Sequence, residues 1–240
     1  METEEIKNYY NNSLRNNSNS YEFERWEKGS QERSSYVSTR NAVEKYAIPI
    51  MADGNILELG PGPGTWTKLL LKKSPSSTYD LVDISEEMLK QAKLSLGDRE
   101  NINYIQSDIL DFVSDKKYDF FFSSRIIEYV PDKSKAVQII TNTLKSGASG
   151  YLVTKTPHPK RFWGIKNNSP VHQNQISAKD LAKLLKDNEC EVSLLTNVTS
   201  VFPGIRSGFL DGVLTKLCNL LPFVVAKYVS ESYAVVFKKK

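Results

Sequence analysis

The segment Glu58-Leu59-Gly60-Pro61-Gly62-Pro63-Gly64-Thr65 constrains the fold of this chain more than any other feature. It follows a short apolar run, residues 55–59, and opens a helical stretch, residues 65–73. Alternate glycines let a backbone turn tightly and pass close to a ligand. Free N–H groups and the positive end of a helix at such a turn favour a carboxylate or a phosphate. The segment therefore predicts a strand, a ligand-binding turn and a helix in succession.

Strands and helices alternate along the rest of the chain. Further strands are expected at residues 78–82, 102–106, 118–123, 150–155, 191–196 and 232–238, and helices at 38–47, 85–96, 133–144 and 177–188. This spacing predicts an α/β fold, a Rossmann-like sheet of seven mostly parallel strands with helices on both faces and an antiparallel last strand. Residues 1–48 are expected to form a helical cap or lid, and 49–240 the core, with an insertion at about 202–228.

The composition is ordinary for a soluble globular protein and carries no strong charge signature. The 240 residues carry a net charge of +4, which is too small an excess to indicate nucleic-acid binding. Only Cys190 and Cys218 are present, without the spacing of a metal site, so a reducing cytoplasm and no metal are expected. The polar start of the chain lacks the apolar core of a secretory signal. Charged residues interrupt the apolar stretch 209–229, which predicts no membrane span.

Three acidic residues follow the first three strands. Glu58 precedes the first glycine by two positions, where a carboxylate is placed to hold a cationic amino group. Asp83 ends the second strand, where its two oxygens can accept from a ribose diol. Asp108 follows the third strand and can receive an exocyclic adenine amino group while Ile109 packs on the ring. Asp108 has the alternative role of starting the turn through residues 110–112.

Together these motifs resemble the class I S-adenosylmethionine (SAM) dependent methyltransferases, in the subgroup described as UbiE-like or methyltransferase-11-like. They read ILELGPGPGTW, LVDISEEML, IQSDILDF, YDFFFSSRIIEYVPD and GYLVTKTPHP. The resemblance implies SAM as the cofactor and S-adenosylhomocysteine as its product. Beyond Glu58, it implies cofactor contacts from Gly60, Pro61, Gly62, Gly64, Asp83, Ile84, Met88, Asp108, Ile109, Ser123, Ser124 and Arg125, with Arg40 as a further ligand for the SAM carboxylate.

The sequence departs from the family pattern where a catalytic base is often found. Many relatives carry a histidine where this chain has Glu128 or Tyr129. The two histidines, His158 and His172, follow the fifth strand, and His172 is the preferred base because it precedes the capped helix at the expected pocket rim. A surface or structural histidine is the alternative for either one.

Several negative signs favour a small-molecule acceptor and no nucleic acid. Ser123-Ser124-Arg125-Ile126 stands where an Asn-Pro-Pro-Tyr segment would serve amino-group methylation, and no face dense in Lys and Arg stands out. The expected acceptor atom is an oxygen, as in a phenol, a sugar or a related hydroxyl. Tyr10, Trp26 and Trp163 are candidate acceptor contacts, with ordinary packing as the alternative for both tryptophans. A SAM-binding module without catalysis and an NAD-dependent dehydrogenase remain as rivals.

The insertion at 202–228 has two interpretations. Its apolar residues recur at near-helical spacing, which is typical of a helix packed on the sheet or on a second copy of the chain. The alternative is an apolar cover for a lipid or lipid-linked acceptor at a membrane surface. Either a monomer or a homodimer is compatible with the sequence.

Overall fold

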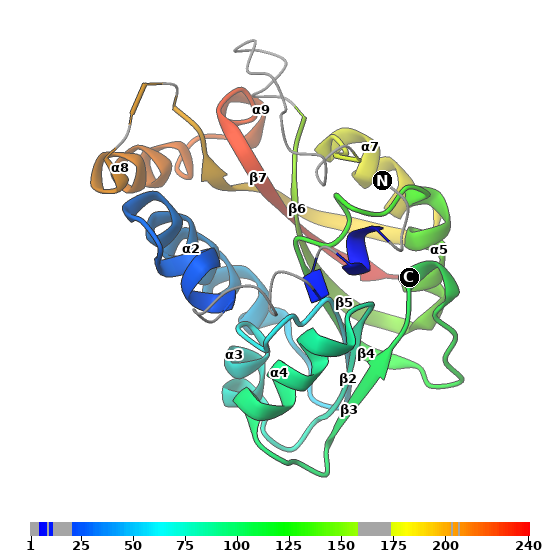
Figure 1. Ribbon diagram of the computed structural model, residues 1–240. Coiled ribbons are helices and arrows are strands. Elements are labelled where there is room, and N and C mark those ends of the chain that lie inside the picture. Colours follow the sequence, from blue (N-terminus) through cyan, green and yellow to red (C-terminus); the bar gives the residue numbers. More distant parts are fainter. Residues whose placement is uncertain (1–4, 9, 12–20, 158–173, 203, 206) are drawn as a thin grey trace.

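The chain was analysed as a computed structural model, which describes residues 5–8, 10–11, 21–157, 174–202, 204–205 and 207–240. The expected seven-stranded sheet is present, in the order β3-β2-β1-β4-β5-β7-β6, with β7 antiparallel to both of its neighbours (Figure 1). The strands are β1 Asn55–Leu59, β2 Thr78–Asp83, β3 Ile102–Gln106, β4 Tyr118–Ser124, β5 Leu144–Lys155, β6 Cys190–Ser200 and β7 Ser230–Lys239. The predicted fold class is therefore confirmed.

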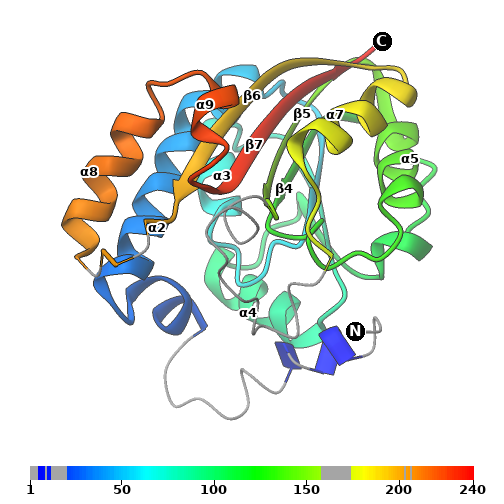
Figure 2. The same cartoon turned by 90° about the horizontal axis from the view of Figure 1, so that it is seen from above.

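Helices cover both faces of the sheet (Figure 2). The helices α2 Ser30–Ala42, α3 Thr67–Lys73 and α4 Glu86–Leu96 pack on one face, and α5 Lys133–Thr143 and α7 Ala178–Asp187 pack on the other. The alternation of side chains along β4 explains this arrangement. Phe120 and Phe122 belong to the core under α2, α3 and α4, whereas Phe121 belongs to the core under α5 and α7. A strand buried on both sides is apolar at successive positions, as its sequence predicted.

The ends of the helices follow the capping residues in the sequence. Ser85 Oγ accepts a hydrogen bond from Met88 N at 3.1 Å and starts α4, which ends at Gly97 with φ +80°. Ser177 Oγ accepts from Asp180 N at 3.2 Å and starts α7. The N-terminal helix is longer than expected, because α2 begins at Ser30 and continues into the single turn η2, Val43–Ala47.

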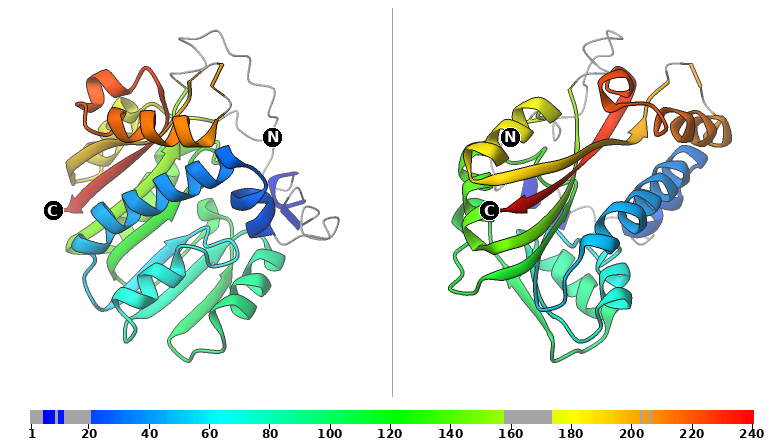
Figure 3. Two further views of the ribbon diagram at one scale, coloured as in Figure 1. Left: turned by 90° about the vertical axis from the view of Figure 1, so that its left-hand side faces the viewer. Right: turned by 180° about the vertical axis from the view of Figure 1, so that it is seen from behind.

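The last strand lies inside the sheet and not at its edge. β7 pairs with β5 on one side and with β6 on the other, so β6 forms the edge. Seven of its ten residues are buried, which fits a central strand. The connection from β6 to β7 holds α8 Gly208–Cys218 and α9 Phe223–Ala226, where the insertion was expected, and α8 lies beside α2 (Figure 3). Among the described residues, no helix has the length and hydrophobicity needed to traverse a bilayer.

Candidate functional site

A cleft opens at the carboxyl ends of β1, β2, β3 and β4. Its lining includes Gly60 from the turn after β1, Asp83 from the end of β2, Asp108 after β3 and Arg125 after β4. The N-terminal segments contribute further lining, including Tyr10 and the one-turn helix η1, Phe23–Glu27. In a parallel sheet these strand ends meet at one edge, which is where open α/β sheets bind ligands. Segments far apart in sequence therefore form one cleft.

The glycine turn is shaped by contacts within the protein. Gly60 has φ +68°, and a Cβ added there would lie 2.0 Å from Cδ1 of Ile126. Gly62 has φ +54° and also lines the cleft, although a Cβ there would meet nothing within 4 Å. Positive φ favours glycine at both positions. Gly64 does not line the cleft and instead approaches Leu96 of α4.

The three glycine N–H groups of this turn are already bonded within the protein, so they are not the free donors that the sequence predicted. Gly60 N donates to Val82 O at 2.8 Å, and Gly64 N donates to Pro61 O at 3.0 Å. Gly62 N donates to Asp83 Oδ2 at 3.2 Å. Pro61 and Pro63 have no N–H at all. The turn thus joins β1 to β2 through hydrogen bonds. It shapes the wall of the cleft more than it supplies hydrogen-bond donors to a ligand.

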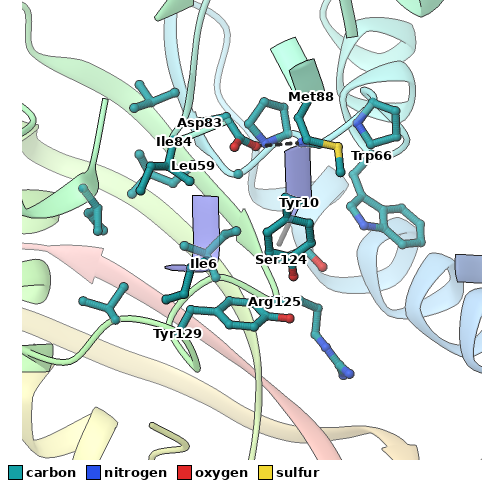
Figure 4. Close-up of a pocket in the computed structure, with 18 of the residues that line it drawn as sticks. Ile6, Tyr10, Leu59, Trp66, Asp83, Ile84, Met88, Ser124, Arg125 and Tyr129 are labelled. Atoms are coloured by element: carbon teal, nitrogen blue, oxygen red, sulfur yellow. Dashed lines mark hydrogen bonds between the residues drawn. The ribbon is translucent and has the colours of Figure 1, made fainter. Parts of the chain in front are cut away.

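Asp83 lies in the cleft with its carboxylate fixed by the backbone (Figure 4). Besides the bond from Gly62, Oδ1 accepts from Ser85 N at 2.9 Å. Burial raises the pKa of Asp83 to about 6, although the backbone hydrogen bonds act in the opposite direction. A carboxylate held this way presents its remaining lone pairs in one direction, toward hydroxyl donors of a bound ligand.

The third-strand end combines a polar and an apolar contact. Asp108 lines the cleft and also caps the short helix η4, Ile109–Asp111, because its Oδ1 accepts from Leu110 N at 2.9 Å. The turn-starting role considered for Asp108 is therefore real, and its second oxygen is not used by that bond. Ile84, Met88 and Ile109 also line the cleft and add an apolar surface to the two aspartates. This surface suits a flat apolar ring with polar groups at its rim.

Two residues assigned to the cofactor lie behind the cleft surface. Glu58 is 1% exposed and is absent from the lining. Burial, with a smaller contribution from Asp83, raises the pKa of Glu58 to about 8. Ser123 Oγ donates to Leu59 O at 3.0 Å and so joins β4 to β1. Their contact with a cofactor stays a prediction.

The residues after β4 form the other end of the cleft, away from Asp83 (Figure 4). Ser124 and Arg125 line it, and Arg125 has φ +69°, a conformation that costs a non-glycine residue energy. Its backbone N donates to Val153 O at 2.8 Å, and its Nε lies 3.2 Å from Oε1 of Glu128. Backbone and ion pair together hold the guanidinium group in place.

Glu128 anchors this end of the cleft to the sheet. Its side chain is fully buried, and Oε2 accepts from Thr154 Oγ1 at 2.8 Å and from Lys155 N at 3.2 Å. Lys155 Nζ in turn lies 3.1 Å from Oε1 of Glu231. Burial raises the pKa of Glu231, but Lys155, Arg125 and Arg25 lower it by more, so these cations and the two carboxylates form one network. Three cations against two carboxylates leave a net positive charge here.

Aromatic residues from the N-terminal segments complete the cleft wall. Tyr10 packs edge-on against Tyr129, with ring centroids 5.8 Å apart, and Tyr21 packs against Tyr10 at 6.2 Å. The guanidinium carbon of Arg25 lies 4.6 Å from the centroid of the Trp26 ring. Burial raises the pKa of Tyr10 and of Tyr129, so both remain neutral phenols at physiological pH.

Sequence reasoning placed some acceptor contacts and missed others. Tyr10 and Trp26 line the cleft, and Trp26 also packs on Trp66 with ring centroids 5.6 Å apart, so its packing role is present while the acceptor contacts stay a prediction. Arg25 and Tyr129 also line the cleft and were not assigned there. The side-by-side placement of Arg25 and Trp26 was the one available signal for Arg25, since cations often stack on indole rings.

Of the remaining predicted residues, Arg40 does not line the cleft, and the others lie outside the residues that the structure describes. Arg40 is exposed on α2, where its Nε bonds Oε1 of Glu44 at 2.9 Å, and it is not part of the lining. His158, Trp163 and His172 fall outside the described residues. Within the described ranges, no group of three or more His, Cys, Asp or Glu side chains is arranged to hold a metal ion.

Comparison with known proteins places this chain among methyltransferases. Residues 56–147 match the family described as "Methyltransferase domain". Malonyl-[acyl-carrier protein] O-methyltransferase 2 of Ilyobacter polytropus is 34% identical over 140 residues, which cover 55% of this chain and 53% of that protein. Trans-aconitate 2-methyltransferase of Rhodopseudomonas palustris is 31% identical over 120 residues, covering 50% and 45%. The matched region thus spans about half the length of these curated relatives.

Solved structures share the fold at low sequence identity. Geranyl diphosphate C-methyltransferase from Streptomyces coelicolor, solved with Mg²⁺, geranyl diphosphate and S-adenosylhomocysteine, gives a TM-score of 0.67 at 13% identity, covering 99% of this chain and 98% of that one. An N-methyltransferase from Bradyrhizobium japonicum, solved with S-adenosylhomocysteine, gives 0.62 at 15% identity, covering 96% and 98%.

Proposed function

Because this chain belongs to the class I SAM-dependent methyltransferase family, we propose that it transfers the methyl group of SAM to a carboxylate oxygen of a small organic acid. The acid is free or carried on an acyl carrier protein. Relatives of this chain are named for both kinds of acceptor, malonyl-[acyl-carrier protein] and trans-aconitate. The proposal replaces the phenol or sugar hydroxyl that the sequence alone favoured.

The observation that carries this proposal is the charge at the acceptor end of the cleft. Arg25 and Arg125 both line it, and their carboxylate neighbours Glu128 and Glu231 are shared with Lys155. A guanidinium group matches a carboxylate with two parallel hydrogen bonds and keeps its charge at all physiological pH values. A neutral phenol or sugar gains little from such a pair of cations. An anionic acceptor therefore fits this end of the cleft best.

The cofactor fits the opposite end. Asp83 presents acceptor oxygens beside the glycine turn, and Ile84, Met88 and Ile109 form an apolar surface that leads to Asp108. These residues would hold the ribose, the adenine ring and its amino group. The same turn argues against a dinucleotide, because its glycine N–H groups are already bonded and two carboxyl side chains lie near it. A pyrophosphate needs free donors and positive charge at that point.

A carboxylate acceptor also removes the need for a catalytic base. When bound, SAM supplies a methyl group on a positively charged sulfur, and that sulfur leaves as a neutral thioether as the new O–CH₃ bond forms. A carboxylic acid is already ionised at neutral pH, so no proton has to be removed first. The residues of the chain then need only to orient the acid and exclude water. Arg25 and Arg125 would orient it, with Tyr10, Tyr21 and Tyr129 closing the wall. Residues 1–48 would serve as the cap over this end.

Transfer of labelled methyl groups to a panel of acceptors tests the proposal. Free dicarboxylic and tricarboxylic acids, malonyl-acyl carrier protein, phenols, sugars and amines would be incubated with methyl-labelled SAM. We expect label in the acids only, released as volatile methanol after mild alkali because methyl esters hydrolyse there. Label in alkali-stable ethers or amines contradicts the carboxylate assignment. SAM binding without transfer to any acceptor would favour the non-catalytic module.

A further inference from the structure

Helix α8 is buried through its small and polar residues. Its two fully buried positions are Gly208 and Thr215. A Cβ on Gly208 would lie 2.1 Å from the backbone oxygen of Ser30, so the start of α8 touches the start of α2. Polar bonds join the two helices, since Ser34 Oγ donates to Asp211 Oδ2 at 3.0 Å. The periodic apolar residues of this helix are therefore not the side that packs on the protein.

Those apolar residues face solvent instead. Of the thirteen exposed large hydrophobic side chains among the described residues, nine lie between positions 209 and 228. The apolar face, as we define it, consists of the six that are more than half exposed: Phe209, Leu210, Leu217, Leu220, Val224 and Val225. A soluble surface seldom gathers so many, and such a patch marks a place of contact with another apolar surface.

The charges that α8 and the end of α9 place beside the apolar face are positive, while Glu27 and Arg33 of the N-terminal helices line the hollow next to Phe209. Lys216 on α8 is exposed, and Lys227 follows α9 with its Nζ 5.1 Å from the centroid of the Tyr228 ring. Asp211 is the one acidic residue between positions 207 and 229, and it is turned toward α2, where it bonds Ser34. Apolar side chains together with lysines and an aromatic ring are typical of helices that lie in the interface of a bilayer.

The apolar face adjoins the acceptor end of the cleft. Gly208 N donates to Ser30 Oγ at 3.3 Å, and Ser30 follows η1, which carries Arg25 and Trp26 of the cleft wall, by three residues. Figures 2 and 3 show the starts of α2 and α8 side by side next to this N-terminal segment. A surface that binds at α8 and α9 would therefore lie next to the cleft.

We propose that the apolar face docks the protein on a lipid surface that carries anionic headgroups. The side chains of α8 and α9 enter the boundary between headgroups and acyl chains, while Lys216 and Lys227 contact the phosphates. The helices lie along the surface, because α8 has eleven residues and a spanning helix needs about 20. This docking does not depend on the reaction or on the proposed acid acceptor.

Flotation with vesicles tests the docking in the absence of SAM. The full chain would be mixed with vesicles of phosphatidylcholine alone and with vesicles containing about one third phosphatidylglycerol. We expect binding to the anionic vesicles that falls at least tenfold in the triple variant Phe209→Ser, Leu220→Ser, Val224→Ser. The double variant Lys216→Glu, Lys227→Glu should lose the preference for phosphatidylglycerol.

A matched control replaces apolar side chains that are equally exposed but lie outside the apolar face. Leu94 and Val113 are 79% and 86% exposed, against 78% and 80% for Phe209 and Leu220. Leu94→Ser with Val113→Ser should leave vesicle binding unchanged. The proposal is overturned if the unaltered chain does not bind vesicles. It is also overturned if sedimentation shows a dimer that the triple variant dissociates, because a second copy of the chain would then cover the apolar face. SAM binding, measured separately by calorimetry, reports on the proposed function and is expected to be the same in all variants.

Discussion

The end of the cleft that carries Asp83 is built from consecutive strand ends, whereas the end that carries Arg125 is assembled from segments far apart in the chain. The first uses residues 58–112, in which each strand is followed at once by its ligand-facing residue. The second joins Ile6, Tyr10 and residues 21–27 to the loop after β4, and a charge network links it to β5 and β7. In related enzymes, the end of the cleft built from consecutive strand ends can therefore stay the same while the other end changes with the acceptor.

The first way to sharpen this comparison is to break the charge network of the acceptor end. Glu128→Ala removes the buried carboxylate that faces Arg125 and accepts from Thr154. Leaving a buried charge without its partner costs about 3–5 kcal/mol, so the free energy of unfolding in urea should fall by that order. Glu100→Ala, at an exposed position, should leave it nearly unchanged. An equal effect of both variants contradicts the anchoring role of Glu128.

The second test isolates the cofactor end. Asp83→Ala removes the carboxylate expected to accept from the ribose, and hydrogen bonds to charged groups are worth about 1.5–3 kcal/mol each. The Kd for S-adenosylhomocysteine, measured by calorimetry, should rise about 100-fold, roughly 3 kcal/mol. Asp98→Ala, whose side chain is 90% exposed, is the control and should bind normally. Unchanged affinity in the Asp83 variant removes Asp83 from the cofactor site.

The third test isolates the acceptor end without touching the network's buried carboxylate. Arg25→Met keeps an apolar stem near Trp26 but removes the guanidinium group. We expect kcat/KM for the acid acceptor to fall about 30-fold, or ~2 kcal/mol, because one charged hydrogen-bond donor is lost. The Kd for S-adenosylhomocysteine should stay the same. Arg40→Met should change neither quantity, and a weaker cofactor affinity in that variant would instead support the sequence expectation for Arg40.

The smallest expected effect is a pH dependence confined to the cofactor end. Burial raises the pKa of Asp83 to about 6, and bound hydroxyl donors favour its ionised form. SAM affinity should therefore be high above pH 6 and fall about tenfold from pH 7 to pH 5, as Asp83 takes up a proton. Glu58, with its pKa near 8, stays largely protonated over this range. Asp83→Asn should bind with a flat profile, and an unchanged slope in that variant points to another group.

The residues that line the Asp83 end of the cleft were predictable because their signals are local. Each strand, its following turn and its acidic residue lie within a few positions of one another, so Gly60, Asp83 and Asp108 could be named from sequence spacing alone. The free N–H groups expected at the turn were the exception. Their internal partners, Val82 O and the carboxylate of Asp83, come from the next strand and leave no trace in the turn itself.

The acceptor end and the insertion depend on packing between distant segments. The neighbouring Trp26 is the one sequence signal at Arg25, and it does not indicate that Arg25 meets the residues after β4. In α8, the apolar spacing predicted a buried face, but the close approach at Gly208 buries the opposite side of the helix. The face that an amphipathic helix buries depends on the shape of the neighbouring helix. For α8 that neighbour is α2, which is far away in the sequence. The position of β7 inside the sheet is a pairing of the same long-range kind.

A crystal structure with S-adenosylhomocysteine and a dicarboxylic acid tests the central claim most directly. The account predicts the ribose hydroxyls at the carboxylate of Asp83, the adenine between Ile84 and Ile109, and a carboxylate of the acid at Arg25 and Arg125. A cofactor bound away from Asp83, or an acid bound away from both arginines, would contradict it.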